Sequence, residues 1–379
     1  MKSVCICGTI QHRNDIVLKL SQEYQIKCYL EHRNIYDKKY FDYKDVYTYE
    51  EYGYDAIDYY IIAYAKKEMI DETLEVLKEH NVSRDKVVVY NDFFDTLQLD
   101  VLKRYAHENK TFDNIVLGMS HAKSDIKLSM CFDNTFSFAG PSMDLFCHRE
   151  ILRYLNKNYP QQMRMLKNVI IELPYYTFNY DLSSFKKFFL TKMFYFYSFN
   201  NYHNYTNCEY INEFSQFEKM FLQNMRSQPY IADENTEYDI NTKFVPLKKK
   251  IYHLVDMLKV IQNHDKVWEA NFDSTKHENI VIFKEIIDLI KEKNPHIKII
   301  IVIAPFNPLF RISHKKTILQ KKKEFYNYIK YVEDSVDVVD LFESINSSKY
   351  FLDHCHLNKA GAIKWTQILC ENIKKILNY

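Results

Sequence analysis

Short hydrophobic runs alternate with amphipathic segments over the first part of the chain. In residues 1–105, apolar runs such as VCICGTI, IKCYLE and KVVVYN are separated by helical patterns such as DETLEVLKEHN. Strand and helix signals in alternation are typical of βαβ units, whose strands lie parallel. The pattern therefore predicts a small Rossmann-like α/β domain over residues 1–105.

A second alternating series covers residues 112–379. Its apolar runs include IVLGM, NVIIEL and KIIIVIAPF, and its last helix is expected from about Asn358 to Leu377. Residues 180–265 interrupt the series with aromatic, basic stretches such as FKKFFLTKMFYFYSF. Without this insertion, the pattern predicts a doubly wound, five-stranded parallel sheet of flavodoxin-like type. We expect the helical insertion to form a packed lid or a dimer face, with peripheral membrane contact as the alternative.

The composition fits a globular protein of two domains. Of the 379 residues, 47% are hydrophobic and 27% are charged, as in folded soluble proteins. The 51 basic and 50 acidic residues nearly cancel, so no overall charge favours nucleic acid. The apolar run IIIVIA is far shorter than the roughly 20 residues that cross a bilayer. Because the cysteines are sparse and the N-terminus lacks signal-peptide features, we expect reduced thiols and a cytoplasmic protein.

Glycine is rare, and its positions indicate where the backbone is special. The five glycines are Gly8, Gly53, Gly118, Gly140 and Gly361. In so glycine-poor a chain, they should be retained where φ is positive or where backbones approach closely. Gly8 could serve a dinucleotide-binding turn, but GTIQHR lacks the other glycines of that fingerprint, so no tightly bound cofactor is expected. Gly118 and Gly140 each follow a predicted strand, at the sheet edge where ligands bind.

Two polar segments could supply a catalytic site. Ser120 leaves a buried strand in VLGMSHA and enters a helical turn, as a nucleophile or as a simple helix N-cap. Asp353 and His356 lie three residues apart before the last helix, either as loop and cap residues or as the acid and base of a serine-dependent site. A metal site using His354, Cys355 and His356 is disfavoured, because adjacent residues rarely direct their side chains to one ion. We therefore predict no metal.

The order of these motifs resembles the SGNH/GDSL hydrolase superfamily over about residues 112–379. The resemblance implies that Ser120 is the nucleophile, His356 the base and Asp353 the acid that orients it. It also implies that the N–H groups of Ser120 and Gly140 line the oxyanion hole. Met119 stands where the family usually has aspartate.

The third motif of that family is altered here. Its glycine-x-asparagine is replaced by IELPYYTFNYDLS, so the asparagine donor is missing. We assign the Tyr175 hydroxyl to the oxyanion hole in its place, and Tyr176, Asn179 and His121 to substrate binding. The alternatives are packed tyrosines and a solvated His121 at the helix start.

The resemblance implies acyl transfer through an acyl-serine. Water as the acceptor gives an O-acetylesterase, and a sugar hydroxyl gives an O-acetyltransferase, for which acetyl-CoA is a candidate donor. The aromatic insertion and the small N-terminal domain resemble bacterial polysaccharide-locus proteins, which implies a cell-surface glycan or its precursor as substrate. The rival hypothesis is a catalytically degenerate binding or assembly protein with a nucleotide or nucleotide-sugar site in the N-terminal domain. The oligomeric state stays open, with a homo-oligomer as one alternative.

Other polar residues are expected to be structural. His148 and Arg149 are predicted on a surface, and residues 315–323, KKTILQKKK, on a solvated helix face. Glu172 ends a strand near the presumed site, and its role is left open.

Overall fold

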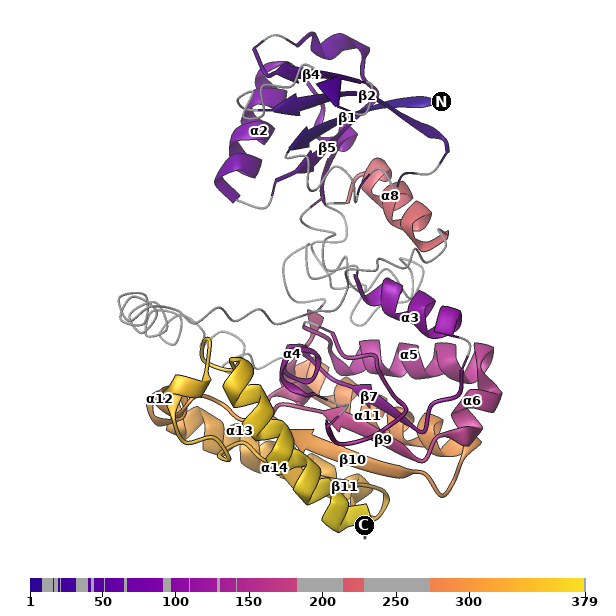
Figure 1. Ribbon diagram of the computed structural model, residues 1–379. Coiled ribbons are helices and arrows are strands. Elements are labelled where there is room, and N and C mark those ends of the chain that lie inside the picture. Colours follow the sequence, from indigo (N-terminus) through magenta and orange to yellow (C-terminus); the bar gives the residue numbers. More distant parts are fainter. Residues whose placement is uncertain are drawn as a thin grey trace. The chain divides into compact units, whose positions relative to one another are not determined.

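The computed structural model describes most of the chain in two compact units (Figure 1). The described residues are 1–8, 16, 20, 22–31, 40–41, 44–50, 52–64, 67–90, 97–108, 110–127, 130–140, 142–182, 214–227 and 273–377. The first unit comprises Met1–Lys103 and Ser183–Ile231, and the second comprises Arg104–Leu182 and Ala232–Tyr379.

The first unit contains a six-stranded sheet in the order β3-β4-β2-β1-β5-β6. The strands are β1 (Lys2–Gly8), β2 (Tyr24–Glu31), β3 (Tyr40–Phe41), β4 (Lys44–Thr48), β5 (Tyr59–Ala63) and β6 (Val87–Val89). Only the two-residue β3 pairs antiparallel; the others are parallel, as the alternating pattern predicts. Counted along the chain, the parallel strands lie in the order 3-2-1-4-5, which is the order of the Rossmann sheet. Among the described residues, helical elements between these strands include η1 (Tyr54–Ala56), α2 (Lys67–Glu79) and η2 (Arg84–Lys86).

Helix α8 (Gln216–Ser227), from the predicted insertion, groups with this first unit. Phe217 is 1% exposed, and its ring stacks on Tyr59 at a centroid distance of 3.9 Å. The structure thus differs from the prediction that the whole insertion belongs to the second domain. Buried aromatic contacts such as Phe217 on Tyr59 place α8 with the first unit, although α8 lies within the sequence range predicted for the second domain. The rest of the insertion, and its predicted role as lid, dimer face or membrane contact, lies outside the described residues.

The second unit contains the predicted five-stranded parallel sheet (Figure 1). Its strands are β7 (Asn114–Leu117), β8 (Thr135–Ser137), β9 (Asn168–Glu172), β10 (Lys298–Ile303) and β11 (Asp337–Asp340). They lie in the order β11-β10-β9-β7-β8, the doubly wound order of flavodoxin-like folds. The fold class expected from the alternating pattern is confirmed.

Helices follow the strands of this second sheet. They are α4 (Ser120–Asp125), α5 (Leu145–Asn158), α6 (Pro160–Met165), α11 (Asp273–Lys293), α12 (Pro308–Ser313), α13 (Lys315–Ile329) and α14 (Lys359–Leu377); short turns are η5 (Thr177–Asn179), η9 (Lys330–Ser335) and η10 (Ser348–Tyr350). Helix α3 (Leu97–Glu108) precedes β7, and the boundary between the two units falls within it, after Lys103. Trp365, Leu369 and Ile373 of α14 form one core cluster with strand residues such as Ile170 and Val302. This packing fixes α14, and with it the loop that precedes it, against the sheet.

A disulfide joins Cys131, in the segment after α4, to Cys370 in α14. The prediction of reduced thiols is therefore wrong for this pair. The sequence separation of 239 residues hid their proximity, because sparse cysteines carry no pairing signal.

Three residues predicted on the surface are buried. His148 is 1% exposed, and burial lowers its pKa to about 3. Arg149 is 9% exposed and forms ion pairs with Glu150 at 2.9 Å and Glu285 at 3.0 Å. Lys321, within the stretch predicted as a solvated face, is 4% exposed. His148 and Arg149 are buried because α5 packs against α11, whereas Lys321 lies on α13 with its Nζ 3.9 Å from Glu324. The local pattern did not show which of these helices are covered on two sides.

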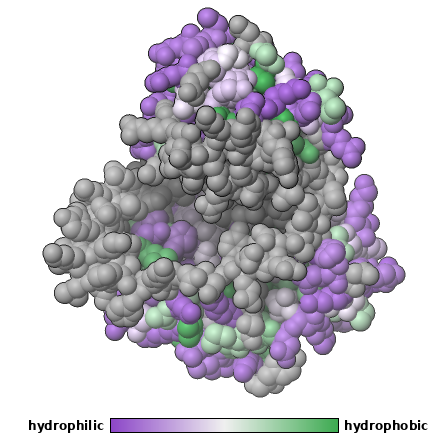
Figure 2. All heavy atoms as spheres, turned by 45° about the horizontal axis from the view of Figure 1, so that its top comes forward, coloured by the Kyte–Doolittle hydropathy of each residue, from purple (hydrophilic) through white to green (hydrophobic). Residues whose placement is uncertain are grey.

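The surface shown in Figure 2 is mostly hydrophilic where it is coloured, with hydrophobic residues scattered singly among the polar ones. Within the part of the chain that the structure describes, the helices lack the combination of length and apolar character that a membrane span requires.

Candidate active site

Ser120, His356 and Asp353 meet in the second unit. His356 Nε2 lies 2.8 Å from Ser120 Oγ, and His356 Nδ1 lies 2.7 Å from Asp353 Oδ2. Ser120 is the first residue of α4, directly after β7, and the other two lie in the loop before α14. The side chain of His356 is 30% exposed. The predicted serine, base and acid therefore form a continuous chain of hydrogen bonds that is partly exposed to solvent at His356 and Asp353.

Local hydrogen bonds shape the loop that carries His356. The backbone pairs Phe351 with Leu357 in an antiparallel bridge. Asp353 Oδ1 accepts the N–H groups of Cys355 at 2.8 Å and His356 at 2.7 Å, which leaves Oδ2 for the imidazole. Burial alone would raise the pKa of Asp353, but the hydrogen bonds and the positive charge of His356 hold it well below its usual range. An ionised Asp353 fixes the imidazole tautomer whose Nε2 accepts from the serine.

The turn before Ser120 requires glycine at position 118. Gly118 has a φ of +155°, and a Cβ there would lie 2.7 Å from Ala122 Cβ and 2.8 Å from Glu172 Cβ. A side chain would thus be strained and would clash on two sides. The expectation that this glycine marks a close approach is confirmed.

His121 and Glu172 form a buried pair beneath this turn. His121 is 2% exposed and Glu172 is fully buried, with His121 Nδ1 3.1 Å from Glu172 Oε1. The alternative of a solvated His121 is therefore wrong, and a side chain so buried is poorly placed to touch substrate. Glu172 Oε2 also accepts the Met119 N–H at 2.9 Å, so the glutamate anchors the residue before the nucleophile.

Two further residues hold the His356 loop, and the sequence reasoning missed both. Asn307 donates from Nδ2 to the Asp353 carbonyl at 3.1 Å and from its N–H to the His354 carbonyl at 3.0 Å. Asp125 Oδ2 accepts the Leu357 N–H at 3.2 Å. The Asn-Pro pair at the start of α12 was a readable helix-cap signal, whereas nothing in the sequence pointed from Asp125 to Leu357.

Two of the predicted oxyanion donors are engaged elsewhere. The Gly140 N–H donates to the Gly118 carbonyl at 3.1 Å. The Tyr175 hydroxyl donates to the Asp340 carboxylate, with distances of 2.8 and 2.7 Å to its two oxygens. Asp340 ends β11, on the opposite side of β9 from the strand that leads to Ser120. We therefore withdraw Tyr175 from the oxyanion hole, and the geometry does not support Gly140 as a donor.

Tyr176 and Asn179, the other two residues predicted to bind substrate, lie in different surroundings. The Tyr176 hydroxyl lies 3.9 Å from Met119 Sδ, so this buried tyrosine lies beside the nucleophile turn. Asn179 is 1% exposed, and its Nδ2 lies 3.4 Å from Glu324 Oε2 on α13. Asn179 is therefore packed against a helix, and its predicted contact with substrate is not supported.

Two groups of residues near the site have metal-ligating atoms. In the described ranges, His121, Cys355 and His356 form one group and Asp353, His354 and Cys355 the other, each with ligand atoms within 4.8 Å of one another. Both nitrogens of His356 already bond to Asp353 and Ser120. Burial raises the pKa of Cys355 well above its usual value, which disfavours the thiolate that metals bind. The arrangement suits acid-base chemistry better than metal binding.

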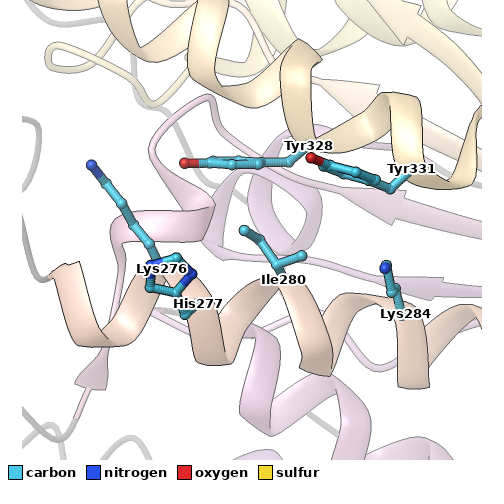
Figure 3. Close-up of a pocket in the computed structure, with 6 residues that line it drawn as sticks. All are labelled: Lys276, His277, Ile280, Lys284, Tyr328 and Tyr331. Atoms are coloured by element: carbon cyan, nitrogen blue, oxygen red, sulfur yellow. The ribbon is translucent and has the colours of Figure 1, made fainter.

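A pocket of about 560 Å³ lies apart from these residues, between α11 and the end of α13 (Figure 3). It is lined by Lys276, His277, Ile280, Lys284, Tyr328 and Tyr331. Two tyrosine rings face the α11 side chains across it (Figure 3), and Lys284 Nζ is 5.1 Å from the centre of the Tyr331 ring. None of the residues predicted from the sequence as site residues lines this pocket.

Comparisons with known proteins give weak similarity. One family model, which carries no descriptive name, matches residues 197–378, and no curated protein matches the sequence. Among solved structures, a candidate platelet activating factor from Streptococcus pneumonia has 11% identity and a TM-score of 0.36, covering 81% of this chain and 99% of its own. A lipase from a goat rumen metagenome has 12% identity and a TM-score of 0.34, covering 69% of this chain and 97% of its own. TM-scores this low do not carry a functional argument, which therefore rests on the side-chain geometry.

Proposed function

We propose that the second unit is a serine-dependent esterase or acyltransferase that acts on O-acyl groups of a carbohydrate. The observation that carries the reaction type is the hydrogen-bonded chain from Ser120 through His356 to Asp353. The motif order that resembles the SGNH superfamily supports the same reaction. The carbohydrate part rests on that resemblance alone.

In the first step, Ser120 Oγ attacks the ester carbonyl while His356 Nε2 takes the serine proton. Asp353, held ionised by its hydrogen bonds, stabilises the imidazolium that forms. His356 then returns the proton to the leaving group, an alcohol from an ester or the CoA thiol from acetyl-CoA, and the acyl group remains on Ser120. In the second step, water or a sugar hydroxyl attacks the acyl-serine, with His356 again as base.

Charge on the tetrahedral oxygen needs preorganised donors. The Ser120 N–H is one candidate, because Ser120 is the first residue of α4 and the first N–H groups of a helix have no intrahelical acceptor. With Gly140 and Tyr175 engaged elsewhere, we propose the Ser120 N–H as the donor common to both steps.

The test is intact-mass analysis of the full chain after reaction with a fluorophosphonate. We expect one adduct on the wild type and none on Ser120→Ala or His356→Ala. Ser124→Ala, on the same short helix, is the matched control and should label normally. A folded wild type without adduct, or an adduct that persists in His356→Ala, would contradict the proposal.

The identity of the acyl acceptor, water or a sugar hydroxyl, is tested separately on wild-type protein that reacts with the fluorophosphonate. Release of acetate from acetylated oligosaccharides in water would favour the esterase. Transfer from acetyl-CoA to an oligosaccharide would favour the transferase. Both activities should disappear in Ser120→Ala.

A binding protein with a relict site is the second candidate. The Rossmann strand order of the first unit, with Gly8 at the end of β1, supports a nucleotide or nucleotide-sugar ligand there. Saturable binding of such a ligand, together with failure of fluorophosphonate labelling, would favour this candidate over the enzyme.

A further inference from the structure

A buried carboxylate and a buried imidazole lie directly behind the proposed nucleophile. Glu172, the last residue of β9, receives the Met119 N–H on one oxygen and lies 3.1 Å from His121 Nδ1 with the other. Glu172 and His121 are 0% and 2% exposed. Since neither side chain reaches the surface, any effect of the pair on the reaction acts through other groups.

The pair lies beside the proposed base. The ring centres of His121 and His356 are 5.4 Å apart, and the rings are inclined by 31°. Within the described part of the chain, His121 Nε2 is buried without a hydrogen-bond partner. Burial alone would lower the pKa of His121, but the charge and hydrogen bond of Glu172 outweigh it and raise that pKa. The raised pKa and the 3.1 Å contact with Glu172 favour the protonated imidazole, and thus an ion pair whose charges cancel next to His356.

A single net charge at this distance would disturb the base. An opposite or like charge within a few ångströms shifts a titration by about 1 to 3 pH units. An unpaired Glu172 would favour the imidazolium form of His356, and an unpaired His121 cation would oppose it. Neutralising both charges within one buried pair avoids either shift.

We propose that Glu172 and His121 are positioning residues that together hold the turn carrying Ser120 and shield His356 from a net charge. The catalytic part of this inference rests on the proposed function. Among the described residues, Asp353, Asp125 and Cys355 are other titratable groups that interact with His356, and His354 lies 3.8 Å from Asp353.

The test follows the titration of His356 directly, by NMR of histidine labelled at Cε1, with the His356 signal assigned from His356→Ala. In His121→Gln, the carboxylate loses its counter-ion, so the midpoint of His356 should rise relative to the wild type. In Glu172→Gln, the midpoint should fall or stay unchanged. The double variant should return the midpoint to the wild-type value.

The proposed role of Glu172 in holding the turn before Ser120 is tested by the rate of fluorophosphonate labelling, measured at a pH above which the rate no longer changes. Glu172→Ala removes the acceptor of the Met119 N–H, and we expect at least a tenfold loss. Glu172→Gln keeps an amide oxygen there and should restore most of the rate. A merely destabilising role would give no such rescue, and it would not raise the His356 midpoint in His121→Gln while leaving it unraised in Glu172→Gln.

Asp144→Asn is the matched control. Asp144 is 1% exposed, and its two oxygens accept the N–H groups of Cys147 and Leu182. Its loss should lower the unfolding temperature without moving the His356 midpoint. A His356 midpoint that moves the same way in both single variants, or that does not rise in His121→Gln, would overturn the inference. Because NMR needs no activity, these outcomes are distinct from a wild type that simply fails to label.

Discussion

Asp125 carries an ionisable group into the interior beside two histidines. It is 1% exposed, one oxygen accepts the Leu357 N–H at 3.2 Å, and the other has no hydrogen-bond partner among the described residues. Burial, the largest influence, raises its pKa from 3.8 to about 7. Near neutral pH, this carboxyl group therefore changes charge next to the loop that carries His356.

The raised pKa predicts a pH-dependent stability. Between about pH 4 and 7 the folded state keeps a proton that the unfolded state has released, so wild-type stability falls as pH rises through this window. Asp125→Asn lacks this titration. Its free energy of unfolding relative to wild type should thus increase by up to about 4 kcal/mol from pH 4 to 7 and then level off. Urea unfolding across this range measures the difference, and a difference that stays constant with pH would contradict the prediction.

At the residue scale, the sequence indicated residues that can be recognised by their type and motif. It missed residues whose role depends on a partner that is distant in the sequence. Ser120, Asp353 and His356 were singled out because their types and order match a known catalytic pattern, and the structure brings their side chains together. Tyr175 and Asn179 were placed wrongly because a local stretch does not show which neighbouring element a side chain will meet, here Asp340 and Glu324. Glu172 acts on Met119 across 53 residues, a relation that no local pattern encodes.

At the scale of elements, the segment that begins at Ser120 and the loop that carries His356 are linked through helix α14. The Cys131–Cys370 bridge joins the segment after α4 to α14. Thr366 of the same helix accepts the Lys127 N–H at 3.1 Å and donates to the Asp125 carbonyl at 3.2 Å. Helix α14 therefore connects the segment that begins at Ser120 with the loop that carries His356.

Loss of the bridge should loosen this connection. Disulfides that close long loops typically contribute about 2 to 4 kcal/mol, so reduction should lower the unfolding midpoint of the wild type measurably and slow labelling of Ser120. The double variant Cys131→Ser/Cys370→Ser should reproduce the reduced protein and respond no further to reductant. Calorimetric scans with and without reductant test this, and a wild type that is insensitive to reductant would refute it.

The buried strands followed from the sequence more readily than the assignment of the helices. Buried strands such as Ile299–Ile303 are continuous apolar runs, which parallel sheets covered on both faces require. The assignment of α8 to the first unit could not be predicted from the sequence. Its amphipathic pattern indicates that one face is covered, but not which domain covers it.

At the scale of the whole molecule, the proposed chemistry belongs to one unit. Ser120, His356, Asp353 and their partners Glu172 and Asn307 all lie in the second unit. Unit 1 contributes none of these residues, although its two segments precede and follow residues 104–182 in the sequence. A mutation that disturbs the packing of unit 1 should therefore leave fluorophosphonate labelling of Ser120 in unit 2 largely unchanged.

Phe217→Ala tests this separation. Phe217 of α8 is 1% exposed and packs on Tyr59 and Tyr24, with ring centres 3.9 and 5.8 Å apart. Removing a buried phenylalanine costs about 3 to 5 kcal/mol, so hydrogen exchange in β1 and β5 should accelerate strongly. The rate of fluorophosphonate labelling of Ser120 should stay within about twofold of wild type, since a shift of less than 0.4 kcal/mol in its barrier is expected. A proportional loss of labelling would instead make the first unit part of the catalytic structure, because only a dependence of the Ser120 site on unit 1 packing could transmit the change.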